Sequence, residues 1–255
     1  MARLLQQIIE EPRACSYLPD RCASLQHRIM LDLSAEELEP MLARGWRRFG
    51  PDYFRPACGP CSACVPIRVP TASFRPSKSQ RRALRAVSGL KAVIGPPRVD
   101  NERLDLYHRW HAFREQAREW SPANIDFESY YLSFAFPHPA VREIAYYDEL
   151  SGKGRKLVGV GICDETPNAW SAVYFYYDPA YARRSPGIAN VLFQLKLAAS
   201  RRRAHVYLGY LVLGCPSMHY KSSFRPNERL VGWPEPDEEP QWRAASDERE
   251  EALKL

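Results

Sequence analysis

The N-terminal half of the chain is organised around the stretch Tyr53-Phe54-Arg55-Pro56-Ala57-Cys58-Gly59-Pro60-Cys61-Ser62-Ala63-Cys64-Val65-Pro66-Ile67-Arg68-Val69. It carries three cysteines at a constant spacing, and its Gly-Pro pair breaks any helix between them. Thiolates on one tight loop can converge on a single ion or cluster, and two-residue gaps are the usual spacing of metal ligands. The sequence therefore predicts a site for zinc or an iron–sulfur cluster, the alternative being thiols that bind no metal. The predicted ligands are Cys15, Cys58, Cys61 and Cys64.

The bulk composition is that of a globular protein. The chain has 255 residues, of which 45% are hydrophobic, enough for one large domain or two small ones. No stretch approaches the roughly 18 consecutive apolar residues of a membrane helix, and the N-terminus is too short and polar for a signal peptide. We therefore expect a cytoplasmic protein with no membrane partner, in which the seven cysteines stay reduced.

The charge is unevenly distributed along the chain. The net charge is +6, but the tail from Pro234 holds eight acidic and only three basic residues. Residues 1–233 therefore carry a net charge of +11, which favours a polyanionic partner such as nucleic acid. A charge excess that only aids solubility is the alternative. The proline-rich, acidic segment 234–255 is expected to be a largely disordered tail or a weakly helical end.

Two segments near the cysteine loop have clear helical signals. Ser34 and Glu37 form a capping box at the start of a helix predicted over 34–44. After a strand predicted over 65–74, at a sheet edge because of its prolines, Ser79 is expected to cap a second helix. On that helix Arg81, Arg82 and Arg85 share one face with no acidic neighbour, a pattern typical of phosphate binding or of a solvated face.

The rest of the chain predicts a mixture of strands and helices, and hence an α+β fold class. The predicted helices are 101–118, 126–134 and 186–201, and the predicted strands are 141–147, 156–163, 169–177 and 205–213. The last strand delivers Gly209-Tyr210 to a glycine turn, which Tyr220, Lys221 and Arg225 follow closely. Glycine permits close approach of a ligand, tyrosine can stack on a base, and the cations can hold phosphate. An ordinary strand and loop is the alternative.

Taken together, these motifs resemble those of the aminoacyl-tRNA–protein transferases, the arginyl- and leucyl-transferases of the N-degron pathway. The N-terminal part of the resemblance is Cys15-Ser16-Tyr17-Leu18-Pro19 with Tyr53-x-Arg55-Pro56-x-Cys58-x-x-Cys61-x-Ala63-Cys64. The C-terminal part is Tyr174-Phe175-Tyr176-Tyr177-Asp178-Pro179, Tyr207-Leu208-Gly209-Tyr210 and Gly214-Cys215-x-x-Met218-x-Tyr220-Lys221. The resemblance covers most of residues 14–230.

The resemblance implies a GNAT-like acyltransferase domain at 96–233, with a cysteine-containing subdomain at 1–95 packed on it. It implies transfer of arginine or leucine from aminoacyl-tRNA to the N-terminal α-amine of acceptor proteins that begin with Asp or Glu, which marks them for degradation. The middle region departs from the family pattern, and the sequence leaves open which amino acid is transferred. Because the aminoacyl ester is already activated, we expect neither ATP nor CoA as a cofactor.

The resemblance also suggests roles for individual residues. Asp178 is a candidate general base or amine-orienting group, and Tyr177 and Tyr220 are candidates for assisting the oxyanion or the leaving 3′-oxygen. The candidates for tRNA binding are Arg81, Arg82, Arg85, Tyr210, Lys221 and Arg225. A planar guanidinium suits a carboxylate, so Arg68 and Arg75 are candidates for binding the acidic side chain of the acceptor.

Two other functions compete with this hypothesis. An acetyl-CoA-dependent N-acetyltransferase would use Arg184-Ser185-Pro186-Gly187-Ile188-Ala189 as its pyrophosphate loop, although Pro186 removes one N–H donor. A non-enzymatic, metal-stabilised nucleic-acid-binding module would use the cysteine loop and the arginine helix, and leaves the strand-rich half unexplained. Binding of CoA would favour the first, and equal binding of charged tRNA and unrelated RNA the second.

Overall fold

The computed structural model of the chain describes residues 2–118, 125–150 and 154–245. The strands are, in chain order, β1 (Arg3–Ile9), β2 (Arg13–Ala14), β3 (Cys22–Ala23), β4 (Leu25–Leu31), β5 (Arg47–Phe49), β6 (Asp52–Pro56), β7 (Cys64–Pro70), β8 (Leu90–Gly95), β9 (Val141–Leu150), β10 (Gly154–Glu165), β11 (Ala169–Tyr177), β12 (His205–Val212), β13 (Glu228–Leu230) and β14 (Trp242–Ala244). The helices are α1 (Ala35–Ala43), α2 (Lys78–Ala86), α3 (Asn101–Arg118), α4 (Phe127–Tyr130) and α5 (Pro186–Ser200), with a π-helical turn η1 (Tyr131–Ala135) and 3-10 turns η2 (Pro179–Arg184) and η3 (His219–Ser223). Within those three ranges, no helix has both the length and the apolar character needed to cross a membrane.

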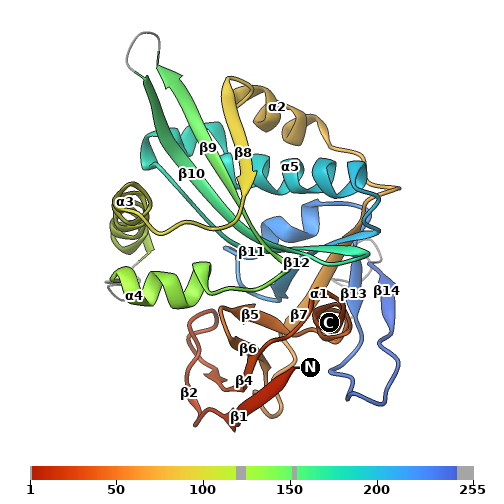
Figure 1. Ribbon diagram of the computed structural model, residues 1–255. Helices are drawn as coiled ribbons and strands as arrows, with labels where there is room; N and C mark the ends of the chain where they lie inside the picture. Colours follow the sequence, from red (N-terminus) through yellow and green to blue (C-terminus); the bar gives the residue numbers. More distant parts are fainter. Residues whose placement is uncertain (1, 119–124, 151–153, 246–255) are drawn as a thin grey trace.

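A large mixed sheet forms the centre of the molecule (Figure 1). Its eight strands run in the order β14-β13-β7-β12-β11-β10-β9-β8. Every neighbouring pair is antiparallel except β11 and β12, which α5 connects as a crossover between parallel strands. A smaller sheet, in the order β1-β4-β6-β5, lies at the foot of the molecule. The mixed α and β composition and the large sheet agree with the predicted α+β class.

Helices cover both faces of the large sheet. In Figure 1, α3 and α4 lie on one side of β8–β10, and α2 and α5 lie on the other. The alternation of side chains along β10 feeds both layers. Val160 and Ile162 pack under α3, whereas Cys163 joins the core that Val191 and Leu195 of α5 complete. The central strands are therefore buried on both faces of the sheet.

Capping boxes start the two predicted N-terminal helices. Ser34 Oγ accepts from the Glu37 N–H at 3.2 Å, and the Glu37 carboxylate accepts from the Ser34 N–H at 2.8 Å, which confirms the prediction for α1. For α2 the predicted cap was wrong by two residues. Ser77 caps the helix instead of Ser79, because Gln80 at the third helical position returns a side-chain bond to the Ser77 N–H.

The expected boundary at residue 95 does not divide the large sheet. β7 lies inside the sheet between β13 and β12, and β8 forms its far edge, so both belong to the same sheet as residues 141–212. The predicted edge position of β7 was therefore wrong. Its two prolines are tolerated because the ladder with β13 pairs only Ile67 and Arg68, which lie between them.

The expected disorder of the acidic tail is wrong for residues 234–245. β14 pairs with β13, and the Trp242 indole N–H donates to the Ala43 carbonyl at 3.1 Å. Arg44 donates to three main-chain carbonyls of this segment at 2.9–3.1 Å, and Arg55 Nη2 lies 2.7 Å from a Glu235 carboxylate oxygen. Cations of α1 and β6 therefore hold the segment against the body. Residues 246–255 lie outside the described residues.

Candidate active site

The two parallel strands of the large sheet separate soon after they meet. Ala169–Ser171 of β11 lie opposite His205–Tyr207 of β12, and the described residues contain no further register pair between these strands. Beyond that point β11 continues along β10, and β12 continues along β7. We call the interval between residues 172–177 and 208–212 the strand gap. Main-chain groups on its two sides cannot satisfy one another through a ladder, so side chains or a ligand must do so.

Arg47 of β5 reaches into the narrow end of the strand gap. Its Nη1 donates to Ser171 Oγ at 2.7 Å, and its Nη2 donates to the Ala172 carbonyl oxygen. That carbonyl lies just beyond the last pair of β11 with β12, so the guanidinium replaces the missing strand partner. Burial lowers the pKa of Arg47, and an enclosed guanidinium is stable only when its donors are used in this way.

Lys221 of η3 places a second cation at the same position. Its Nζ donates to the Tyr210 carbonyl oxygen at 2.7 Å, and the side chain is buried. Gly209 has a φ of +77°, and a Cβ there would lie 3.6 Å from Arg47 Nε and 3.7 Å from Lys221 Nζ. Glycine thus supplies both the left-handed backbone and the space beside the cations. Burial, followed by repulsion from Arg47, lowers the pKa of Lys221 to about 7.

The cysteine loop borders the strand gap from the N-terminal side. Cys64 lies opposite Val212 of β12, and the Leu213 N–H donates to the Ala63 carbonyl at 2.8 Å. Burial raises the pKa of Cys64 to about 12, so its thiol is neutral at physiological pH. The Cys64 thiol therefore adds polarisable, uncharged surface to the site rather than negative charge.

The four predicted metal ligands share one neighbourhood without forming a ligand set. After burial, the neighbouring thiols of Cys58, Cys15 and Cys61 raise the pKa of Cys64. The Cys58 thiol, however, donates to the Ser24 carbonyl at 3.3 Å and accepts from the Ser24 N–H at 3.4 Å. In the ranges that the structure describes, no group of three or more His, Cys, Asp or Glu side chains is placed to hold a metal ion. In this arrangement the residues do not fit a metal or cluster, and the metal site stays a prediction.

An aromatic cluster lines the α3 side of β11. The His111 ring stacks on Tyr107 with centroids 4.1 Å apart, and its Nε2 lies 2.9 Å from the Tyr174 hydroxyl. Burial lowers the pKa of His111, so the ring is neutral at pH 7. Burial raises the pKa of both Tyr174 and Tyr220, and the neighbouring phenol of Tyr17 adds a smaller contribution to each, so Tyr17 lies near this cluster and near η3.

Two of the predicted catalytic residues lie in another environment, at the end of β11. Asp178 is buried, accepts from the Ala180 N–H at 3.0 Å and pairs with Lys156 Nζ at 2.6 Å. Burial is the largest single influence and raises the pKa of Asp178, but the hydrogen bonds from Lys156 and the Ala180 N–H, together with the positive charges of Lys156 and Arg109, outweigh it and the pKa is lowered. A carboxylate of lowered pKa is a poor proton acceptor. The Tyr177 ring packs edge-on against Trp110, at 5.8 Å.

The third predicted catalytic residue and one of the predicted tRNA-binding residues border the strand gap. Tyr220 lies on η3 with 43% of its surface exposed, next to Lys221. Tyr210 supports the fold, because its hydroxyl donates to the Gly45 carbonyl at 2.8 Å and its ring packs on Trp233. A base-stacking role for Tyr210 gains no support from this position. Arg225 is exposed beyond η3.

The remaining predicted cations divide into exposed side chains and one that is held in an ion pair. Arg81, Arg82 and Arg85 are all exposed on α2, as their shared face predicts, and Arg75 is exposed just before that helix. Arg68 is held in place. Its Nε lies 2.6 Å from a Glu228 carboxylate oxygen, and its guanidinium stacks over the Trp242 ring at 4.3 Å. The acceptor-binding role predicted for Arg68 is therefore not supported.

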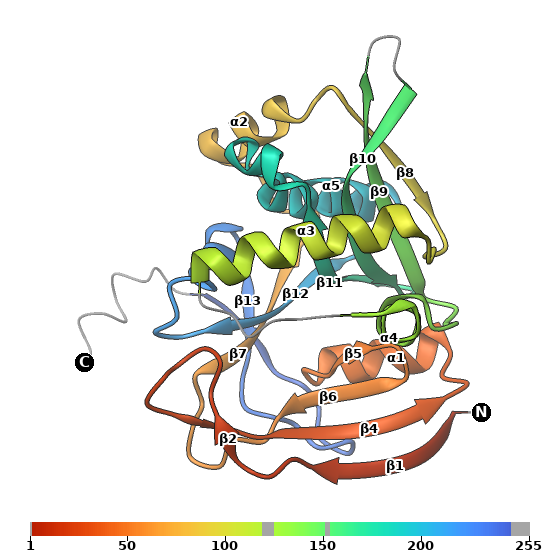
Figure 2. The same cartoon turned by 90° about the vertical axis from the view of Figure 1, so that its left-hand side faces the viewer.

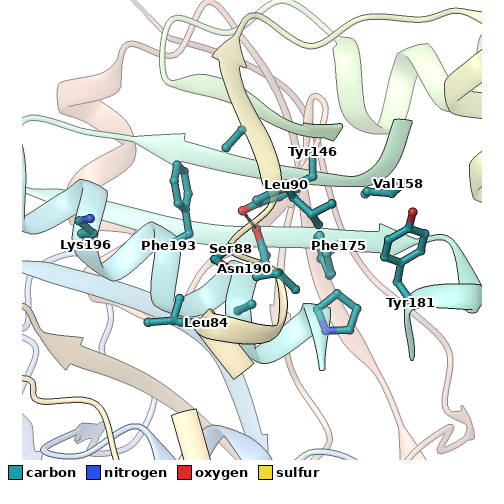
Figure 3. A pocket seen from close by; sticks show the side chains of 15 residues that line it. Leu84, Ser88, Leu90, Tyr146, Val158, Phe175, Tyr181, Asn190, Phe193 and Lys196 are labelled. Carbon is teal, nitrogen blue, oxygen red and sulfur yellow. Dashed lines mark hydrogen bonds between the residues drawn. The ribbon is translucent and has the colours of Figure 1, made fainter. Parts of the chain in front are cut away.

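A separate cavity of about 280 Å³ lies on the α5 face of the sheet, between α2, β8–β11 and α5 (Figure 3). Gly159 of β10 lines it, and a Cβ at Gly161, two residues further on, would meet Asn190 Oδ1 at 2.7 Å. The missing side chains leave room for the Asn190 amide, which accepts from the Tyr146 hydroxyl at 2.9 Å. Lys196 is the one charged side chain among the residues that line the cavity. Of the residues that border the strand gap, the lining includes Phe175 alone.

Sequence reasoning missed Arg47, Tyr17 and His111 as members of the site. Arg47 comes from the small sheet and meets β11 across 124 residues of chain, a separation that no local pattern encodes. Tyr17 belongs to the motif that begins at Cys15, but within that motif a role was predicted only for Cys15. His111 falls on the predicted helix 101–118, where its contact with Tyr174 depends on tertiary packing.

The chain matches two known family profiles. The profile described as "Arginine-tRNA-protein transferase, N terminus" matches residues 13–82, and the one described as "Arginine-tRNA-protein transferase, C terminus" matches residues 102–231. Together they include the cysteine loop, the whole of the strand gap and η3. They leave out β1, β8 and β14.

Curated relatives align with nearly the full chain. A protein of Campylobacter jejuni named aspartate/glutamate leucyltransferase is 31% identical over 86% of this chain and 90% of its own. A protein of the same name from Pseudomonas fluorescens is 36% identical over 87% of this chain and 92% of its own. Among solved structures, FemX gives a TM-score of 0.48 at 8% identity, covering 73% of this chain and 64% of its own. L-PGS from Bacillus licheniformis gives a TM-score of 0.44 at 13% identity, covering 71% of this chain and 58% of its own.

Replacing Lys221 by methionine should stabilise the fold in a pH-dependent way. The pKa of Lys221 is 10.5 when unperturbed and about 7 in the folded chain, so the unfolded state binds more protons between these values. The free energy of unfolding of the wild type should therefore rise with pH across that window. We expect Lys221→Met to stabilise the protein by about 2 kcal/mol at or below pH 7. This advantage should shrink towards pH 10.

Chemical denaturation at several pH values measures this difference. Lys196→Met is the matched control, because Lys196 is exposed. An advantage of Lys221→Met that does not change with pH would contradict the burial of the ammonium.

Proposed function

The chain belongs to the arginine-tRNA–protein transferase family, and from this premise we propose that it transfers leucine from leucyl-tRNA to the N-terminal α-amine of proteins that begin with Asp or Glu. The observation that carries the proposal is the pair of relatives above, both named aspartate/glutamate leucyltransferase. The aminoacyl-tRNA–protein transferase activity itself goes with the family. The choice of leucine, the acidic acceptor, its marking for degradation and a cytoplasmic site of action, where charged tRNA is available, are proposed.

The reaction needs no activating cofactor in this account. The acceptor nitrogen attacks the carbonyl carbon of the leucyl ester, a C–N bond forms, and the bond from that carbon to the tRNA 3′-oxygen breaks. One proton leaves the nitrogen and one is needed on the 3′-oxygen. A free α-amine has a pKa near 7.7–8.0, so removing its proton at pH 7 costs only about 1 kcal/mol. Position and charge stabilisation can therefore supply most of the rate enhancement.

We place this chemistry in the strand gap, with Lys221 as the group that moves the proton. Its pKa of about 7 suits a residue that accepts a proton from the incoming amine and returns it to the 3′-oxygen. Arg47 keeps that pKa low and adds positive potential where the oxyanion develops. Tyr220, exposed beside Lys221, is positioned to contact the leaving ribose. Asp178 is held by Lys156 and supports the end of β11 instead of acting as the base.

A GNAT-like architecture is part of the proposal. A crossover through α5 joins the one parallel pair that the described part of the sheet contains, and that pair separates where the cations gather. This supports an acyltransferase site between the strands. The competing acetyl-CoA hypothesis has less support, because the family profiles belong to enzymes named for tRNA and Pro186 removes an N–H from the start of α5.

The basic face of α2 is proposed to hold the tRNA backbone. We expect the substitution of glutamate for Arg81, Arg82 and Arg85 together to raise KM for leucyl-tRNA at least tenfold and to leave kcat nearly unchanged. Each lost phosphate contact should also flatten the dependence of tRNA binding on salt. Initial rates of transfer at varied leucyl-tRNA concentration measure KM and kcat, and filter binding at several salt concentrations measures the salt dependence. Lys91→Glu, an exposed substitution on β8, is the control, and equal losses in the two variants would contradict a specific role for α2.

The donor amino acid is tested by a transfer assay. Peptides beginning with Asp, Glu or Ala are incubated with tRNA charged with radiolabelled leucine or arginine. We expect label from leucyl-tRNA on the Asp and Glu peptides, and at least tenfold less from arginyl-tRNA or on the Ala peptide. Label from arginyl-tRNA alone would refute the leucine assignment and keep the family activity. Label on none of the peptides, together with acetylation from acetyl-CoA, would refute the tRNA donor.

A further inference from the structure

The outermost strand of the small sheet is unusually apolar and open. β1 pairs with β4 on one side only, and all seven of its residues are exposed. Leu4, Leu5, Ile8 and Ile9 have 53%, 58%, 43% and 63% of their surface exposed. Figure 2 shows β1 as the lowest strand of the molecule, away from α3 and the strand gap. A hydrophobic edge strand with free N–H and C=O groups is a template for pairing with another strand.

We propose that β1 pairs antiparallel with β1 of a second copy of this chain, which joins two small sheets into one continuous eight-stranded sheet across a two-fold axis at Gln7. The order of residues in β1 is the reason for choosing a second copy. From Arg3 to Glu10 the sequence reads Arg-Leu-Leu-Gln-Gln-Ile-Ile-Glu, which is complementary to itself when reversed. With Leu5 as the extra residue of a bulge, Arg3 meets Glu10, Leu4 meets Ile9, Gln6 meets Ile8 and Gln7 meets its own copy.

A β-bulge makes this register geometrically possible. Residues directly opposite in an antiparallel pair must lie on the same face. Leu4 and Ile9 are five residues apart and would lie on opposite faces of a regular strand. The extra residue Leu5 shifts the register, so that Leu4 lies opposite Met30 and Ile9 opposite Gln26, both on one face of β4. An axis at Gln7 then sets Leu4 opposite Ile9 of the second copy.

The same register joins the charged ends. Arg3 lies opposite Leu31 of β4, and the Glu10 N–H bonds to the Leu25 carbonyl at 2.9 Å, so both side chains lie on the other face of β1. Arg3 therefore meets Glu10 of the second copy, twice in the dimer, when the Glu10 carboxylate turns from its present partners, His27 at 3.1 Å and Arg13 at 3.3 Å. The present partner of Arg3, Asp32 at 2.8 Å, forms an ion pair in which both side chains are more than half exposed. Such a pair is weak and allows Arg3 to turn.

The main chain of β1 has the matching hydrogen-bonding pattern. Because the Glu10 N–H points to β4, alternation directs the N–H and C=O of Ile9 and Gln7 to the open edge. Natural edge strands are usually protected by proline or by lysine pointing into the pairing edge. Arg3–Ile9 contains neither residue, and its single cation is at the end where Glu10 of the second copy would lie. One strand pair is a small interface, so the dimer should depend on concentration.

Charge reversal tests both the association and its register. Arg3→Glu would bring two carboxylates together at each end of the strand pair, and Glu10→Arg would bring two guanidinium groups together. Each variant alone should weaken the dimer at least tenfold in analytical ultracentrifugation. An equimolar mixture of the two should form a heterodimer as strong as the wild-type dimer, because opposite charges then face each other at both ends. The double variant should also dimerise.

The control is Lys91→Glu, because Lys91 is likewise exposed at an edge strand in an exposed ion pair, with Glu149. It should leave the dimer unchanged. Aminoacyl transfer should persist in every variant, which separates this test from that of the proposed function. A wild-type chain that is monomeric at all concentrations would overturn the proposal. A dimer that single charge reversals do not weaken, or that the mixture does not restore, would overturn the register.

Discussion

The structure depends most on the short contact between β11 and β12. Three residue pairs hold these parallel strands together, and beyond them each strand follows a different neighbour. A continuous ladder would have satisfied the main-chain groups on both sides but would have left no room at the centre of the sheet. The chain instead brings two cations there, Arg47 from the small sheet and Lys221 from η3. The small sheet is thus part of the site and not an appendage to it.

Two neighbouring cations in the interior, Lys221 buried and Arg47 half-buried, are unfavourable for stability, and the surrounding contacts limit that cost. Arg47 has its donors on Ser171 and Ala172, and Lys221 has one on the Tyr210 carbonyl. Burial, together with the repulsion that remains, lowers the pKa of Lys221 into the range where a proton can be both taken and given. The feature that weakens the fold is therefore the one that suits the reaction. Such a conflict is typical of functional sites.

Local signals predicted local structure well. The capping box at Ser34 and the alternation and length of residues 141–213 fixed α1 and the strands and helix of the C-terminal half with small errors at their ends. The errors arose where a distant partner decides the outcome. Arg44 and Arg55 order the acidic segment 234–245, and β13 and β12 enclose a strand whose prolines suggested an edge.

The site shows the same division. Gly209, Tyr220 and Lys221 lie together as their short spacing suggested. Asp178 directly follows β11, which borders the strand gap, yet its carboxylate is held in an ion pair by Lys156 of the neighbouring strand β10. Arg47 has no local signal, since its partner Ser171 is 124 residues away.

The central claim is that acyl transfer takes place in the strand gap beside Lys221. The most direct test is a crystal structure with leucyl-adenosine in which an amide replaces the 3′-ester, because this analogue mimics the donor end and cannot react. We predict that the 3′-nitrogen, which replaces the leaving oxygen, lies within hydrogen-bond distance of Lys221 Nζ, between residues 172–177 and 208–212. Binding in the cavity beneath α5, or beside Asp178, would contradict the account.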